Sequence, residues 1–144
     1  MRSIETLDLE DARAALDVMR AELTRLGAAA VLLVADAHGD PVLMERGDGA
    51  PASSVIIAQN KARTAASERV PSRVVGDRVR SAERLDIAYY GDPRVCGWGG
   101  GLPVWSRPGG AVIGAVAVSG LSEDQDERIA ELGVAAIDAR LSCR

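Results

Sequence analysis

The sequence predicts an α+β fold, in which helices pack on an antiparallel sheet of about five strands in the order α-β-β-α-α-β-β-β-α. The first observation is Ala111–Ser119, an unbroken run of small and β-branched residues, typical of a strand buried on both faces. Gly109-Gly110 predicts a tight turn between that run and a strand over Leu102–Arg107. The second observation is a similar hairpin pattern over Ala29–Ala35 and Val42–Glu45, and hairpins at both ends of the chain indicate antiparallel pairing.

The first element is a helix over Leu9–Leu26, because its apolar residues recur at spacings of three and four. Thr6 or Asp8 can cap the start of this helix, and Gly27 ends it. The polar segment Asp36–Asp40 then predicts the turn of the first hairpin.

A second helix is predicted from a cap at Ser53 or Ser54 to about Arg69, and Pro71 ends it. Four alanines form a stripe of small residues that would let this helix lie close to a sheet: Ala58, Ala62, Ala65 and Ala66. The segment Ser72–Ile87 predicts a further, highly charged helix.

The remaining elements lie in the C-terminal part of the chain. A short strand is expected near Val95, and Pro103 indicates that the strand containing it lies at a sheet edge. The last helix is predicted over Glu123–Leu141, because Ser122 and Gln125 have the spacing of a capping box.

Composition excludes several classes of function. The 144 residues predict one domain over residues 1–144, with 47% apolar and 26% charged residues. A net charge of −4 gives no reason to expect a nucleic-acid partner. Cys96 and Cys143 make neither a disulfide framework nor a metal cluster. The N-terminus lacks an apolar signal region, and no apolar run approaches the roughly 20 residues of a membrane span, so we expect a cytoplasmic protein without a membrane partner.

Six short motifs occur in order over most of the chain, between about Val31 and Gly133. They are Asp36-x-x-Gly39, Arg46-Gly47-Asp48-Gly49-Ala50, Lys61-Ala62-x-Thr64-Ala65, Gly100-Gly101-x-Pro103-Val104, Ile113-Gly114-Ala115 with Val118-Ser119-Gly120, and Gln125-Asp126-Glu127. Together they resemble the GlcG/HbpS-like family, which includes haem-binding proteins and the C-terminal domain of PduO-type proteins. The resemblance implies a profilin-like sheet with flanking helices, a homo-oligomer (a dimer or higher) and haem as a candidate ligand. Residues 68–98 match the family pattern least, and we expect what is particular to this protein there.

Lys61 is the single lysine among 17 cationic residues, and it lies in one of these motifs. Lysine offers a compact charge whose pKa responds to burial, so its use here predicts an ammonium group in a pocket. The alternative is an occasional lysine on a solvated helix face.

All four aromatic residues lie in one glycine-rich window, which holds Tyr89, Tyr90, Trp98 and Trp105 together with Gly97, Gly99, Gly100 and Gly101. Flat side chains around an open loop suit stacking on a planar or apolar ligand. Burial of the tryptophans at a subunit interface explains the same pattern.

Three further features bear on a ligand. The segment Lys61–Arg84 has a net charge of +4, which would attract a carboxylate-bearing ligand, although a charged helix is more often a solvated face. Arg46 and Asp48 either form a small polar site with Lys61 or, in the case of Asp48, organise a turn. His38 is the one histidine and so the obvious ligand of a haem iron, but its place in a turn argues against that role.

Other conceivable iron ligands are Cys96, Met44 and the two tyrosines. With one histidine, we expect neither a catalytic triad nor a tetrahedral zinc site made by the protein alone.

The first hypothesis is therefore a cytoplasmic, homo-oligomeric domain that binds haem or another anionic small molecule. Its predicted ligand-binding residues are Lys61, Arg46, Asp48, Trp98, Gly99, Gly100 and Tyr89, from the Lys61 helix, the Arg46–Ala50 loop and the Gly97–Gly101 loop. The second hypothesis is a cofactor-independent lyase or isomerase acting on a small carboxylate, with Lys61 as acid/base or anchor and Asp48 as its partner. The third is an oligomeric accessory protein without a ligand.

Overall fold

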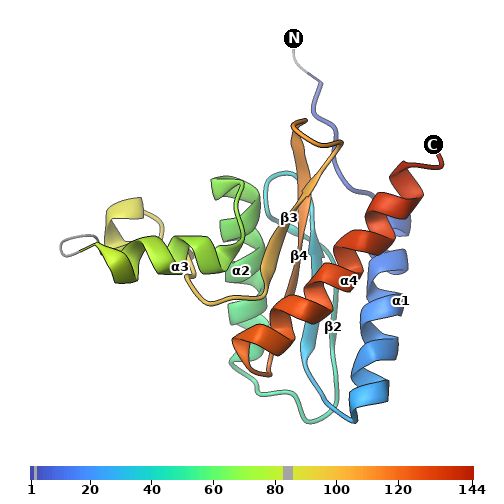
Figure 1. Cartoon of the computed structure of the whole chain (residues 1–144), viewed down its shortest axis with the longest axis horizontal. Helices are drawn as coiled ribbons and strands as arrows, with labels where there is room; N and C mark the ends of the chain where they lie inside the picture. Colours follow the sequence, from blue (N-terminus) through green and yellow to red (C-terminus); the bar gives the residue numbers. More distant parts are fainter. Residues whose placement is uncertain (2, 83–85) are drawn as a thin grey trace.

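Four strands, four α-helices and one short 3-10 helix make up the part of the chain that the computed structural model describes, which is residues 1, 3–82 and 86–144 (Figure 1). Their bounds are α1 Leu9–Leu26, β1 Val31–Ala35, β2 Pro41–Arg46, α2 Ser54–Glu68, α3 Ser72–Ser81, η1 Ile87–Tyr90, β3 Gly101–Trp105, β4 Val112–Ser119 and α4 Glu123–Leu141. The strands form one antiparallel sheet in the order β2-β1-β4-β3. The α+β class and the antiparallel pairing are thus confirmed.

The sheet lies between two layers of helices, with α1 and α4 on one face and α2 on the other (Figure 1). Alternation along β4 serves both layers, because Val116 and Val118 belong to the core under α1 and α4 while Ala115 and Ala117 face α2. This explains the unbroken apolar run in the sequence, since a strand buried on both faces has no solvent-facing side. The expectation of a central strand here is confirmed.

The β3–β4 hairpin differs in detail from the prediction. Pro103 lies in β3 at the edge of the sheet, as expected. The connection is longer than a tight two-residue turn, because the Ser106 N–H donates to Ala111 O at 2.8 Å. Gly109 has a φ of +71° and Gly110 does not share that conformation, so Pro108-Gly109 forms the centre of a turn closed by the Gly110 N–H on Arg107 O.

Two helices begin with the capping boxes that their sequences favour. Asp8 caps α1 together with Asp11, and Ser122 caps α4 together with Gln125. Gly27 ends α1 in the left-handed conformation, with a φ of +62°. The bounds of α1 and α4 therefore agree with the sequence.

The segment between α2 and β3 contains the main corrections. Ser53 precedes α2 but makes no side-chain cap hydrogen bond. Helix α3 ends at Ser81, earlier than the predicted Ile87, and residues 83–85 of that prediction lie outside the described residues. The fifth strand expected near Val95 is wrong, because its N–H donates to Asp92 O in a turn.

Helix α2 packs closely on the sheet, as its alanine stripe predicts. Ala58, Ala62 and Ala65 are fully buried, and a Cβ on Gly101 of β3 would overlap the Lys61 carbonyl oxygen of α2. Helix α3 and η1 project to one side of the molecule (Figure 1). In the described residues, no helix combines the length and the apolar character needed to cross a membrane.

Candidate functional site

Lys61 points from α2 to the end of β4 and the first turns of α4, where it is almost completely buried. Its Nζ lies 2.9 Å from Asp126 Oδ2 and 3.0 Å from the Val118 carbonyl oxygen. The two side chains of this ion pair are only 2% and 3% exposed. The other oxygen of Asp126 accepts the Leu121 N–H at 3.1 Å. The single lysine therefore ties α2 on one face of the sheet to α4 on the other.

The environment of this pair acts on Asp126 in two directions. Burial raises the pKa of the Asp126 carboxyl above its ordinary value, while the Lys61 charge, its hydrogen bond and the backbone N–H of Leu121 oppose that rise. A carboxylate that is buried, but paired and hydrogen-bonded in this way, can hold the ammonium group in place.

Gly99 and Gly100 lie beside this ion pair, where there is no room for a side chain. Gly100 has a φ of +118°, and a Cβ on it would lie 3.0 Å from Lys61 Nζ and 2.6 Å from Val118 O. The Gly99 N–H donates to Glu123 Oε1 at 2.9 Å, at the start of α4. Both glycines are buried, so the loop is shaped by the close approach of its backbone to the ion pair.

A cavity of about 430 Å³ lies beside the ion pair, between the starts of α2 and α4 and the end of β4, and we call it the Lys61 cavity. Its lining includes Lys61 and Trp98 of the predicted site, together with Ser54, Ser119 and Asp126. The structure thus brings together two of the predicted ligand-binding residues in one cavity. The pair formed by Lys61 has Asp126 as its carboxylate, in place of the Asp48 expected from sequence.

The other predicted residues lie elsewhere. Arg46 and Asp48 are exposed, and the Arg46 guanidinium donates to the Ala50 carbonyl across the turn. Tyr89 on η1 is 75% exposed. His38 is exposed in the β1–β2 turn, where its N–H donates to Asp36 Oδ1. This turn follows Ala35, which pairs with Ala115 of β4, whereas Lys61 lies at Val118 near the other end of that strand.

A second cavity, of about 480 Å³, lies between α2, α3 and residues 86–98, and we call it the α3 cavity. Its walls are largely apolar, and its polar side chains are the Arg80 guanidinium, the Cys96 thiol, the Asn60 amide and the Asp86 carboxylate. The apolar lining residues are Ile57, Val79, Ile87, Val95 and Trp98. Burial raises the pKa of the Cys96 thiol, which keeps it protonated in the free protein.

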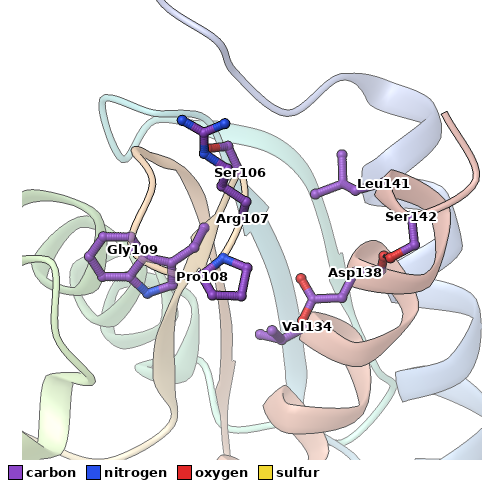
Figure 2. Close-up of a pocket in the computed structure, with 9 residues that line it drawn as sticks. Ser106, Arg107, Pro108, Gly109, Val134, Asp138, Leu141 and Ser142 are labelled. Carbon is purple, nitrogen blue, oxygen red and sulfur yellow. The ribbon is translucent and has the colours of Figure 1, made fainter.

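A third cavity, of about 780 Å³, separates the β3–β4 hairpin from the C-terminal part of α4. Figure 2 shows Pro108 and Arg107 on the hairpin side and Val134, Asp138 and Leu141 on the helix side. Burial raises the pKa of Asp138. Among the described residues that line it there is no histidine, cysteine, methionine or tyrosine.

The cationic segment Lys61–Arg84 is largely neutralised by acidic partners. Arg73 lies 2.8 Å from Asp124 and 2.7 Å from Glu127 of α4, and Arg80 pairs with Asp77 at 2.7 Å. Arg84 lies outside the described residues. Among these cations of α3, Arg73 is the one whose ion pairs attach the helix to α4 in the described residues.

Sequence reasoning missed Asp126 and the α3 cavity. Asp126 stands in the last of the six motifs and among the acidic residues that complement the dipole at the start of α4, but neither feature marked it as the partner of Lys61. The α3 cavity falls in the segment that matches the family motifs least, and its lining includes Gly97 and Trp98 of the glycine-rich aromatic window.

The fold and much of the sequence are shared with known proteins. An uncharacterized 15.0 kDa protein from the dhaT-dhaS intergenic region of Citrobacter freundii is 34% identical over 131 residues, covering 90% of this chain and 91% of that protein. The corrinoid adenosyltransferase PduO of the same organism is 34% identical over 128 residues, which is 85% of this chain but 36% of the enzyme. The chain therefore corresponds to about a third of PduO.

Solved structures agree over nearly the whole chain. Klebsiella pneumoniae ORFY superposes with a TM-score of 0.87 at 30% identity, covering 96% of this chain and 95% of that one. A Streptomyces reticuli HbpS double mutant gives 0.83 at 29% identity, over 94% and 89% of the two chains. A PduOC:heme complex gives 0.82 at 28% identity, over 91% and 94%.

A family model described as "Haem degrading protein HbpS-like" matches residues 7–135. Because the match spans most of the chain, and because the ORFY and HbpS structures share its fold, this protein belongs to the HbpS-like family.

Proposed function

We propose that this chain is a haem-binding domain and that haem occupies the α3 cavity. The observation that carries the proposal is the likeness to the PduOC:heme complex, with a TM-score of 0.82 over 91% of this chain. A protein that shares the fold so completely and is solved with heme makes haem the first ligand to test here.

The chemistry of the α3 cavity fits haem. Haem is flat and apolar with two carboxylate groups, and the cavity offers apolar walls, the indole of Trp98 and the guanidinium of Arg80. Arg80 is half-exposed and pairs with an exposed partner, Asp77, so its guanidinium can turn to a haem carboxylate at little cost. Cys96 supplies a sulfur atom of the kind that ligates haem iron. Bound haem would supply the redox and ligand-binding chemistry of its iron, and the chain supplies binding and orientation.

The two other sites considered for haem fit less well. The large cavity beside α4 has no residue type that commonly ligates haem iron among its described lining residues. His38 lies exposed in the β1–β2 turn and is not among the residues that line the α3 cavity.

A haem titration followed at the Soret band tests the proposal. We expect a saturable one-to-one shift, and an affinity about tenfold lower for Arg80→Glu, because a charged hydrogen bond of about 1.5 kcal/mol is lost. Arg78→Glu is the matched control, since Arg78 is an exposed arginine on α3 outside the cavity lining. Cys96→Ser should move the Soret maximum, and His38→Ala should not. Adsorption without saturation, or equal affinity for Arg80→Glu and Arg78→Glu, would refute the site.

We further infer that the domain works as a homo-oligomer. Large apolar or aromatic side chains remain exposed on the side formed by α2, η1 and the following loop, where Ile56 is 53%, Tyr89 75% and Trp98 55% exposed. Contact between copies would cover such residues. Size-exclusion chromatography with light scattering measures the assembly directly, and a strictly monomeric protein would refute this inference.

A further inference from the structure

We propose that the third cavity, between the β3–β4 hairpin and the C-terminal part of α4, binds a primary amine with an apolar body. The ammonium group of the ligand pairs with the Asp138 carboxylate, and its apolar body lies between the hairpin and the helix. We call this cavity the hairpin cavity. It shares no lining residue with the α3 cavity, so the proposal is independent of haem binding there.

The first observation is a carboxylate that no cation neutralises. Asp138 lies on α4, and Figure 2 shows its carboxylate directed across the hairpin cavity toward Pro108. Within the described residues, no ion pair or hydrogen bond reaches this carboxylate. Burial raises the pKa of Asp138 without an opposing charge or hydrogen bond. A carboxylate that is partly withdrawn from water and has no partner favours a cation beside it.

The neighbours of Asp138 on its own helix face carry no charge. Residues three and four positions apart share a face of a helix, and Val134, Leu141 and Ser142 stand at these spacings from Asp138. All three line the hairpin cavity with it. The Ser142 hydroxyl donates to the backbone carbonyl of Asp138 at 2.9 Å and so does not serve the carboxylate.

The arginines at the end of α4 pair with α1 instead. The guanidinium groups of Arg140 and Arg144 lie 3.2 and 2.8 Å from Asp11 Oδ1. Among the described residues that line the hairpin cavity, Arg107 is the one cation. Figure 2 shows its guanidinium on the hairpin, directed away from Asp138. The chain therefore leaves the Asp138 carboxylate open to the charge of a ligand.

The place of Asp138 near the end of α4 favours a cation for a second reason. The C-terminal end of a helix carries partial negative charge, to which a carboxylate adds. At the start of α4, the carboxylates of Glu123, Asp124 and Asp126 complement the helix dipole. Asp138, at the other end, opposes it. A bound ammonium group offsets both the charge of Asp138 and that of the helix end.

The rest of the hairpin cavity suits an apolar body. Its walls include Trp105, Pro108, Val134 and Leu141, and its volume is about 780 Å³. Small-molecule pockets of this size have mostly apolar walls and a few polar groups that fix the orientation of the ligand. An indole such as that of Trp105 also attracts an ammonium group to its ring face. One carboxylate among apolar walls selects an organic amine over a metal ion, which requires several oxygen ligands.

Amide NMR of the haem-free, full-length protein tests this site. The probe is 2-phenylethylamine hydrochloride, compared with sodium chloride at equal ionic strength and with 2-phenylethanol as the uncharged counterpart. We expect saturable shifts centred on residues 105–109 and 134–142. The amine should bind about fivefold more tightly than the alcohol, a modest factor because the Asp138 side chain stays in part open to water.

Asp138→Asn should weaken binding of the amine about fivefold and leave binding of the alcohol unchanged, because only the charge of residue 138 is lost. Glu131→Gln is the matched control, since Glu131 is an exposed acid of α4 outside the hairpin cavity. It should bind the amine as the wild type does.

Four results would overturn the proposal. They are amine shifts that do not saturate, saturable shifts centred away from the hairpin cavity, an alcohol that binds as tightly as the amine, and an Asp138→Asn protein that binds the amine as tightly as Glu131→Gln does. The wild-type titrations decide the first three without any variant. Because no haem is present, a negative result here leaves the haem proposal standing.

Discussion

A single lysine shows how far sequence reasoning reaches at the scale of one residue. The rarity of Lys61 and its place in a motif predict an ammonium group that is withdrawn from solvent, and the structure buries it to 2% exposure. Its partner could not be predicted, because Asp126 is 65 positions away and meets it only through the packing of α2 and α4 on the sheet. The same packing explains Gly100 and Gly101, whose sequence pattern indicated only an open loop.

We expect Lys61→Met to lower the free energy of unfolding by about 3–5 kcal/mol, because it leaves the Asp126 carboxylate buried without its ion-pair partner. The double variant Lys61→Met/Asp126→Leu should recover most of this loss, since it removes the other charge as well. Urea unfolding of the two variants measures both values. A loss below about 1 kcal/mol for the single variant, as for an exposed pair, would contradict the structural role of the ion pair.

The ion pair between Arg20 and Glu45 on the surface predicts part of the loss of folding stability at acid pH. Arg20 on α1 donates to both oxygens of Glu45 on β2, at 2.8 and 3.0 Å from its Nε, and these hydrogen bonds lower the pKa of Glu45 from its ordinary 4.5. The stability that the pair contributes is present above the unfolded-state pKa and is lost as the pH falls through the lower folded-state pKa.

Glu45→Gln should therefore be less stable than the wild type at neutral pH, and the difference should shrink as the pH falls below about 4.5. Urea unfolding at a series of pH values measures it. A difference that stays constant from neutral to acid pH would show that the charge of Glu45 does not act through Arg20.

Helices and strands that are encoded by neighbouring residues were predicted correctly from the sequence. Segments whose conformation depends on contacts with distant residues were not. Helix α1 has apolar residues at spacings of three and four, and α4 begins at the Ser122–Gln125 capping box, so both helices were predictable from local signals. The segment near Val95 is held by a distant group instead, because the Cys96 N–H donates to Thr64 Oγ1 of α2. The α3 cavity forms in this segment, which is why its lining could not be derived from periodicity.

Helix α3 provides a prediction at this scale. Gly76→Ala would raise helix propensity by about 1 kcal/mol, but its Cβ would overlap the Gly97 carbonyl oxygen. We expect a net loss of stability of about 1–3 kcal/mol and weaker haem binding, because α3 must move away from the loop that lines the α3 cavity. Chemical denaturation and the Soret titration measure the two effects.

Gly133→Ala in α4 is the matched control for a helical glycine, since its Cβ would meet side-chain atoms, Met19 Sδ at 2.8 Å and Val116 Cγ1 at 3.0 Å, in place of a backbone carbonyl. A Gly76→Ala protein that is as stable as the wild type and binds haem equally well would contradict the tight α3–loop contact.

At the scale of the whole molecule, the candidate sites lie at two opposite ends of the sheet. The Lys61 cavity lies at the end of the sheet where α2 and α4 begin, while the His38 turn and the β3–β4 hairpin lie at the other end (Figure 1). The sequence predicted one shared pocket for Lys61, Arg46, Asp48, Trp98, Gly99, Gly100 and Tyr89. In the structure Lys61 and Trp98 line one cavity, while Arg46, Asp48 and Tyr89 are exposed at other places on the surface. The order of motifs along the sequence does not determine which side chains line the same cavity.

Hydrogen–deuterium exchange of the haem-saturated protein, compared with the haem-free protein, tests the haem site most directly. We predict slower amide exchange with haem in α3 and in residues 86–98, which form the walls of the α3 cavity, and little change in the His38 turn or the β3–β4 hairpin. Protection confined to residues 36–40 or 106–111, or no protection at all, would contradict haem binding in the α3 cavity.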